Sequence, residues 1–278
     1  MSAAASLVRL SGACLGGTLF WQGFVHYLRE AHKDGVKLRT VTDRGGNKIK
    51  DTFFAGSTDD TISDELKTGD IVFFSRPCSL MLPCGAAACL GTKAAAAAAH
   101  VIPYDHCAVV VLRNDGTPDL LEATWDQGAV LRPYDERIMR SLADTIVIRP
   151  VHLPSNRAPR ATVDEKARAF AAHWTGRGTA REQLRSFHGS WRRFHQLFER
   201  YRAQGFVIRD KTTAEDTLCP LHPSAMLVAR FYQDVLDVLP RTDKPGYKPC
   251  EDFLPGDLLS AKLRQGATRL QEIQIRNR

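Results

Sequence analysis

Short runs of apolar, β-branched residues recur through the first half of the chain, and polar turns separate them. The longest run, residues 106–112, is too short and too β-branched for a helix and is typical of a strand buried on both faces. Asn114-Asp115-Gly116 supplies a turn, so residues 120–123 (Leu-Leu-Glu-Ala) are its hairpin partner. Similar runs follow a turn at 69–74 and recur at 128–133 and 144–149. The pattern predicts a mostly antiparallel sheet of sequential strands.

From residue 162 the apolar positions change to helical spacing. Residues 163–174 and 180–201 predict two helices, and residues 223–236 predict a third. The apolar residues of the third helix share one face, which is expected to pack on the sheet. Ser224 stands at its N-terminus, where a serine is expected to cap the helix. Sheet and helices together predict an α+β fold.

An apolar segment precedes the predicted sheet. Residues 10–28 carry no formally charged side chain, and as a helix they would cover about 28 Å, close to the hydrocarbon thickness of a bilayer. Their glycines form a small-residue face suited to another transmembrane helix, and Trp21 and Tyr27 lie toward one end, where aromatic rings favour the membrane interface. We interpret residues 1–30 as a retained membrane anchor. A targeting peptide and a soluble amphipathic helix are the alternatives.

Changes in polarity divide the rest of the chain. Residues 31–65 are polar and predict an extended arm or linker before one main domain over 66–260. Within this domain, 77–103 is an apolar insertion with an alanine run, expected to form a short helix, and 160–212 is a basic helical insertion. A polar, basic tail is expected over 261–278.

The chain is moderately basic, with a net charge of +7. Anionic membrane, an acidic protein partner or mitochondrial residence would each explain this charge. No Lys/Arg tract is interleaved with aromatic residues, so nucleic acid is not an expected partner. The arginines at the start and middle of the second helix are interpreted as its solvated face, with anionic lipid as the alternative partner. They include Arg181, Arg185, Arg192 and Arg193.

Seven cysteines at irregular spacings argue against a secreted disulfide framework and favour a reducing compartment. Cys78, Cys84 and Cys89 lack the paired short spacings of zinc sites, and no fourth ligand accompanies them. They are expected to be buried or interface-facing thiols. No metal or cofactor is expected.

His106 and Glu122 are candidates for a general base and the group that orients it, because they stand on neighbouring strands. A core histidine and a glutamate at a strand edge are the alternative. A two-residue turn at Asp115-Gly116 would pair His106 with Trp125 and point Glu122 to the opposite face. A bulge or a longer loop is required to bring Glu122 to the face of His106.

The order of several motifs resembles a known superfamily. They are Gly-Asp-Ile-Val-Phe-Phe (69–74), Asp-His (105–106), Leu-Leu-Glu-Ala (120–123), Ser-Ala-Met-Leu-Val-Ala-Arg-Phe-Tyr (224–232) and Leu-Pro-Gly-Asp-Leu (254–258). Together they resemble the circularly permuted NlpC-type papain-like superfamily, in particular its YiiX-like branch related to lecithin:retinol acyltransferase. The resemblance covers residues 66–155 and 215–260. It implies a papain-like antiparallel sheet packed against helices.

The resemblance also implies roles for individual residues. His106 corresponds to the general base, Glu122 to the residue that orients it, and Ser224 occupies the position of the nucleophilic cysteine. A helix N-terminus and an imidazolium lower the pKa of a thiol enough to form thiolate, but they leave a serine hydroxyl protonated. Cys219, in the loop before the helix, is the alternative nucleophile. Cys107 adjoins the histidine but points to the other sheet face.

These features predict a catalytically silent papain-like domain. We expect a structural or accessory subunit of a membrane-associated assembly, in contact with the membrane and with other subunits through its N-terminal helix. The mitochondrial inner membrane is the expected location, and the cytoplasm is the alternative. The alternative function is a hydrolase or acyltransferase acting on amide, thioester or lipid ester bonds, with His106 and either Ser224 or Cys219.

Overall fold

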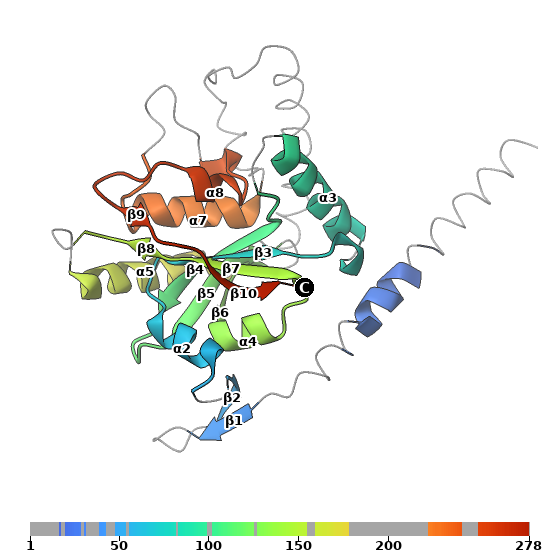
Figure 1. The fold of residues 1–278 in the computed structure, drawn as a ribbon, viewed down its shortest axis with the longest axis horizontal. Coiled ribbons are helices and arrows are strands. Elements are labelled where there is room, and N and C mark those ends of the chain that lie inside the picture. Colours follow the sequence, from blue (N-terminus) through green and yellow to red (C-terminus); the bar gives the residue numbers. More distant parts are fainter. Residues whose placement is uncertain are drawn as a thin grey trace, which may run out of the picture.

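The computed structural model places a six-stranded sheet at the centre of the protein (Figure 1). Its strand order is β10-β7-β3-β4-β5-β6, and every neighbouring pair is antiparallel. The fold is mixed α+β, as the sequence predicts. The strands are β3 (Ile71–Ser75), β4 (His106–Leu112), β5 (Pro118–Thr124), β6 (Gly128–Pro133), β7 (Thr145–Arg149) and β10 (Ile273–Asn277). The residues that the structure describes are 20–28, 39–42, 48–53, 56–81, 83–98, 102–124, 127–154, 159–177, 222–240 and 250–277, with positions 17 and 31.

Smaller elements surround this sheet. Two two-stranded sheets are formed by β1 (Arg39–Thr42) with β2 (Lys48–Thr52) and by β8 (Val151–His152) with β9 (Thr268–Arg269). The α-helices are α2 (Thr58–Glu65), α3 (Pro83–Ala98), α4 (Tyr134–Met139), α5 (Arg160–Trp174), α7 (Pro223–Asp234) and α8 (Asp257–Ser260). Two 3₁₀ helices are η1 (Cys78–Leu80) and η3 (Cys250–Asp252).

Helices cover both faces of the sheet. α5 and α7 pack on one face, which we call the α7 face, against alternate strand residues such as Phe73, Val109 and Leu121. α4 and the end of α2 pack on the other, the α4 face, against residues such as Val110 and Leu120. In Figure 1, α7 lies above the sheet and α4 below it. Because both faces are covered, β4 is buried over six successive residues, which accounts for its unbroken apolar run.

The hairpin between β4 and β5 is closed by a loop longer than two residues. The amide of Arg113 donates to the carbonyl of Thr117, and the amide of Gly116 donates to the carbonyl of Arg113. Gly116 has φ of +86°, in the left-handed region that glycine enters without a steric penalty. The loop pairs Val109 with Leu121, one residue away from the register of a two-residue turn. A shift of one residue moves every side chain of a strand to the other face.

The sequence predicts an extended arm over residues 31–65, but the structure forms strands and a helix in this segment. It contains β1, β2 and α2. Phe53 lies edge-on against Tyr134 of α4, with ring centroids 6.0 Å apart. The Ser63 hydroxyl donates to the Asp135 carboxylate. These contacts join the segment to the α4 face.

The tail expected over residues 261–278 is also corrected. β10 pairs with β7 and forms one edge of the main sheet. Ile273 and Ile275 alternate with polar residues along β10, and both pack against the apolar residues of the α4 face. The period of two between these isoleucines is the pattern of a half-buried strand.

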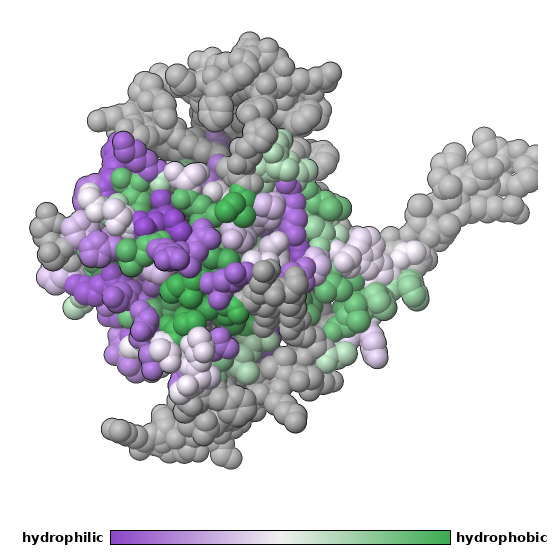
Figure 2. Space-filling view, viewed as in Figure 1, coloured by the Kyte–Doolittle hydropathy of each residue, from purple (hydrophilic) through white to green (hydrophobic). Residues whose placement is uncertain are grey.

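A short N-terminal helix lies beside η1. Residues 20–28 are helical, and the remainder of the predicted anchor falls almost entirely outside the described residues. Trp21 Nε1 donates to the carbonyl of Ser79 at 3.2 Å, and Val25 is fully buried. The other face of this helix leaves Phe20 and Phe24 exposed, and Figure 2 shows apolar atoms on its surface. Among the helices of the described residues, none is both long and apolar enough to cross a membrane.

The apolar insertion contains α3, and a disulfide holds it. Cys78 and Cys89 are bonded, with their Cα atoms 5.7 Å apart. The expectation of free thiols at these two positions is wrong, because η1 brings Cys78 against the second turn of α3, within bridging distance. Cys107 and Cys250 are free and buried. The basic insertion contributes α5, whereas the predicted helix at 180–201 lies outside the described residues.

Candidate functional site

The register of the β4–β5 hairpin brings His106 and Glu122 together. The pairing of Val109 with Leu121 places Glu122 on the same sheet face as His106, at a diagonal position. His106 Nε2 lies 2.6 Å from Glu122 Oε2, and both side chains are almost completely buried. The longer loop that this contact requires is therefore present.

Two arginines from neighbouring elements surround the Glu122 carboxylate. Arg137 of α4 donates from Nε to Oε1 at 2.8 Å and to Oε2 at 3.0 Å, and its guanidinium stacks 4.4 Å from the centre of the Phe74 ring. Arg132 Nε lies 3.6 Å from Oε1. Burial acts to raise the pKa of Glu122, but Arg137 and His106 outweigh it and hold the pKa well below its usual range. Glu122 is ionised at neutral pH.

His106 is neutral in this environment. Burial lowers its pKa first, and the charge of Arg76 lowers it further, against the opposing effect of Glu122. An ionised carboxylate only accepts hydrogen bonds, so Nε2 carries the proton and donates it to Glu122. Nδ1 is then the basic atom of the ring. This is the arrangement of an oriented base, but also of a satisfied core histidine.

Ser224 lies in the first turn of α7 and is fully buried. Its Oγ accepts from the backbone amide of Cys107 at 3.3 Å and lies 3.1 Å from His222 Nδ1. The Sγ of Cys107 is 3.6 Å away. The N-cap of α7 is His222, whose Nδ1 accepts from the amide of Ala225. The expectation that Ser224 caps the helix is therefore wrong, because Pro223 occupies the first helical position and the residue before it is the cap.

The hydrogen bonds of His222 fix the tautomer of its ring and thereby the direction in which the Ser224 hydroxyl donates. Its Nε2 lies 2.9 Å from the carbonyl oxygen of Asp105, which can only accept, so Nε2 is the protonated nitrogen. Nδ1 is left to accept the Ser224 proton. Burial lowers the pKa of His222 to about 3, which corresponds to a cost on the order of 5 kcal/mol for protonating it at neutral pH relative to an ordinary histidine. Such a weak base is far from the pKa near 7 that proton abstraction favours.

The sheet separates the two halves of the predicted catalytic set. His106 packs against Phe74 on the α4 face, with ring centroids 5.7 Å apart. Ser224 contacts Cys107, the next residue along β4, on the α7 face. No hydrogen bond joins Ser224 to His106 among the described residues. The structure therefore brings His106 and Glu122 together but places Ser224 elsewhere, and Cys219 lies outside the described residues.

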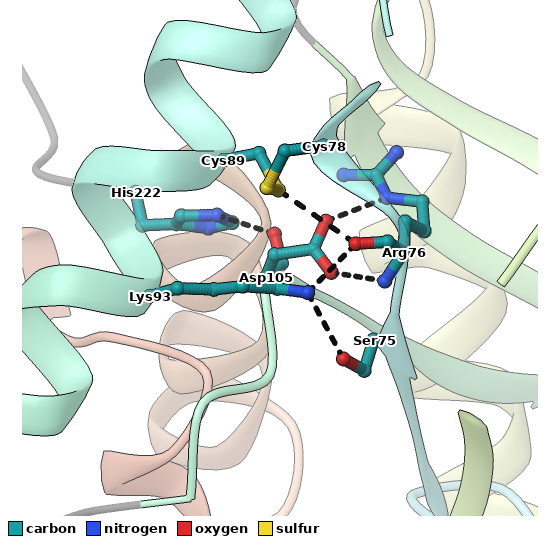
Figure 3. The surroundings of a disulfide bond; sticks show 7 residues. All are labelled: Ser75, Arg76, Cys78, Cys89, Lys93, Asp105 and His222. Atoms are coloured by element: carbon teal, nitrogen blue, oxygen red, sulfur yellow. Dashed lines mark hydrogen bonds and ion pairs between the residues drawn. A yellow bond between two sulfur atoms is a disulfide. The ribbon is translucent and has the colours of Figure 1, made fainter. Parts of the chain in front are cut away.

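A polar cluster at the ends of β3 and β4 links α3 to this region (Figure 3). Asp105, whose side chain is fully buried, accepts from the amide of Arg76 at 2.6 Å and from Arg76 Nε at 2.7 Å. Lys93 of α3 donates to the carbonyl of Arg76 at 2.7 Å and to the hydroxyl of Ser75 at 3.2 Å. Since His222 binds the Asp105 carbonyl, hydrogen bonds run from α3 across the strand ends to the start of α7.

Sequence reasoning missed His222, Asp105 and Arg137. For His222, the signal was the His-Pro-Ser sequence immediately before an apolar helix, since proline at the first helical position marks its predecessor as the cap. Asp105 belongs to the Asp-His motif at 105–106, but the motif alone assigns no role to its carboxylate. Arg137 carries no local signal, because α4 brings it to Glu122 from fifteen residues away.

A cavity of about 720 Å³ lies between the β4–β5 loop and α5, lined in part by Leu112, Arg168 and Ala172, and it includes none of the predicted site residues. In the described part of the chain, no cluster of three or more His, Cys, Asp or Glu side chains is arranged to hold a metal ion.

No protein-family model matches the chain, and the search of curated proteins finds no match. The geometry of the candidate site must therefore support any functional interpretation by itself.

Proposed function

We propose that this protein is a catalytically silent domain of the permuted NlpC-type papain-like class that serves as a structural or accessory subunit of a membrane-associated assembly. One observation carries the proposal. The Ser224 hydroxyl is fully buried and engaged by Cys107 and His222, on the sheet face opposite to His106. A nucleophile must also reach its substrate, and the buried Ser224 hydroxyl is closed to a substrate and lies away from His106.

The proposed membrane-associated assembly rests on the N-terminal helix and the insertion. Residues 20–28 present the exposed aromatic side chains of Phe20, Phe24 and Tyr27, and Leu90 is exposed on α3. Clustered aromatic and apolar surface of this kind is typical of a face that contacts lipid or another subunit. We propose the mitochondrial inner membrane as the location, on the basis of this surface together with the net charge of +7.

Chemical labelling of the native full-length protein tests the silent site. We expect a fluorophosphonate to leave Ser224 unmodified, and any alkylation by iodoacetamide to be the same in the wild type and in His106→Ala. A characterised serine hydrolase in the same reaction controls for probe activity. Stoichiometric modification of Ser224, or alkylation of Cys219 that His106→Ala abolishes, would contradict the proposal.

The proposed assembly has a separate test. We expect the protein in native membranes to require detergent for extraction and to elute in a particle much larger than its own mass of 30.9 kDa. Release as a monomer without detergent would remove the basis for this part of the proposal.

A hydrolase or acyltransferase is the second candidate, and the Ser224–His222 pair favours it. A hydroxyl, a basic ring nitrogen and a carbonyl that orients the ring occur in that order, as in a serine triad. The pKa of His222 near 3 and the burial of Ser224 both oppose this function. The labelling experiment distinguishes the two candidates, with His222→Ala as the variant that must abolish modification of Ser224 if this pair reacts.

A further inference from the structure

Arg149 and Arg269 lie side by side on the α7 face, away from the candidate site. β8 and β9 pair Val151 with Arg269, and the amide of Leu270 donates to the carbonyl of Pro150. Arg149 is two residues before Val151, so it shares the face of Val151 and of its cross-strand partner Arg269. The ladder thus places the two arginines at diagonal positions on neighbouring strands that are distant in sequence.

The guanidinium groups of this pair are incompletely bonded. Among the described residues, Arg149 Nε, Arg269 Nε and Arg269 Nη2 are buried and lack a hydrogen-bond partner. Arg269 Nη1 alone donates, to the carbonyl of Ala261. Buried guanidinium N–H groups are strong donors, and native structures leave few of them unpaired.

The carboxylates of the described residues do not neutralise the positive charges of both arginines. Arg149 Nη1 lies 3.4 Å from Glu272 Oε1, and no carboxylate of the described residues forms an ion pair with Arg269. Burial lowers the pKa of Arg269, and the charge of Arg149 lowers it further. The two arginines thus share a neighbourhood in which one carboxylate, Glu272, is paired with Arg149.

We propose that Arg149 and Arg269 form a binding site for a phosphate group. The three unpaired N–H groups supply donors for a tetrahedral oxyanion, and a dianion neutralises both guanidinium charges where a single carboxylate neutralises one. The proposal is independent of the proposed function, because none of these residues contacts Ser224, His222 or His106 in the structure.

Calorimetric titration of the full-length protein with inorganic phosphate tests the site. We expect saturable binding to the wild type, compared with sodium chloride at equal ionic strength, and binding weakened roughly tenfold or more in Arg269→Gln and Arg149→Gln. Arg113→Gln is the matched control, because Arg113 is fully paired with Asp119 at a distant position, and it should bind as the wild type does. Arg269→Lys keeps the positive charge but loses the paired N–H donors of the guanidinium group. It therefore serves as the test variant if Arg269→Gln fails to fold.

A second arm identifies the source of the phosphate. Vesicles of phosphatidylcholine with and without phosphatidic acid are offered to the same variants. Binding of inorganic phosphate that needs both arginines assigns a soluble phosphate. Arginine-dependent binding of phosphatidic acid vesicles, without binding of inorganic phosphate, assigns a lipid headgroup. If neither ligand binds, or if Arg269→Gln and Arg149→Gln bind as the wild type does, the proposal is overturned.

Discussion

At the scale of single residues, the properties of the candidate site depend on which buried polar atoms have hydrogen-bond partners. Glu122 interacts with His106, Arg137 and Arg132, and these interactions compensate the cost of burying a carboxylate. The Ser224 hydroxyl accepts from the amide of Cys107 and donates to His222 Nδ1, so both of its hydrogen-bonding roles are taken up inside the core. The same burial that strengthens these bonds keeps the Ser224 hydroxyl away from solvent.

The burial of His222 predicts how stability depends on pH. Its folded pKa, near 3, lies below its unfolded value of 6.5, so the unfolded state binds a proton first as the pH falls. This contribution to stability is complete above pH 6.5 and is lost progressively toward pH 3. We expect His222 to account for a loss of about 2 kcal/mol in the free energy of unfolding between pH 7.5 and pH 5.

Urea denaturation at the two pH values, on the wild type and on His222→Asn, measures this loss. Asparagine retains a side-chain oxygen for the N-cap but does not titrate. Between pH 7.5 and pH 5, the free energy of unfolding of His222→Asn should therefore fall by about 2 kcal/mol less than that of the wild type, whatever the absolute stability of the variant. An equal pH dependence in both proteins would show that His222 is not buried in the neutral form.

At the scale of elements, the β4–β5 loop determines which residues can meet. The apolar runs and the period of two predict the strands correctly, because burial on both faces leaves a clear signal. The loop differs from a two-residue turn by a single residue, and that residue determines whether Glu122 faces His106 or the opposite side. Composition around Asn114-Asp115-Gly116 is compatible with both loops, so the sequence leaves the register open.

Gly116 is the position that the loop conformation depends on. Its φ of +86° is costly for any residue with a Cβ atom, although no atom lies within 4 Å of the position that a Cβ would take. Gly116→Ala is therefore expected to destabilise the protein by about 1 kcal/mol through backbone strain alone. Gly91→Ala, inside α3 with equally open surroundings, is the matched control and should be neutral or slightly stabilising. Equal effects of the two changes on urea denaturation would contradict this assignment.

The disulfide is the element-scale feature that the sequence could not predict, because it depends on how α3 folds back over η1. It closes a loop of eleven residues in sequence separation, for which the chain-entropy estimate of stabilisation is about 3 kcal/mol. The hydrogen bonds of Lys93 also attach α3 to the strand ends. Reduction should consequently loosen α3 more than the sheet.

Hydrogen exchange with and without a reductant measures this local effect. We expect residues 83–98 to exchange faster after reduction, while β4 keeps its protection. The double variant with Cys78→Ser and Cys89→Ser is the control, and it should exchange rapidly at α3 whether or not the reductant is present. Unchanged protection of α3 after verified reduction would mean that packing alone holds the helix.

At the scale of the whole molecule, the predicted α+β architecture is present, and the domain boundaries are wider than polarity indicates. Phe53 joins the expected arm to the core, and the isoleucines of β10 join the expected tail to it. Both segments are polar on average but carry a few apolar residues at the positions that pack. The mean polarity of a segment does not reveal such residues. The period of two between the isoleucines of β10, by contrast, is visible in the sequence.

The site was partly predictable for a similar reason. The pairing of His106 with Glu122 follows from strand positions once the register is known. The separation of His106 from Ser224 depends on which face of the sheet α7 covers, and that depends on the packing of the whole α7 face around Cys107 and Val109. Helix position relative to a sheet is a tertiary property that motif order alone does not specify.

Nitrogen-15 chemical shifts of the histidine rings in Ser224→Ala test the central claim most directly. The account predicts that removing the Ser224 hydroxyl changes the Nδ1 shift of His222 and leaves both ring nitrogens of His106 unchanged, while Glu122→Gln does the reverse. Both rings should show a protonated Nε2 and an unprotonated Nδ1 at pH 7. A change at His106 in Ser224→Ala, with His222 unaffected, would place the serine in a triad with His106 and contradict the account.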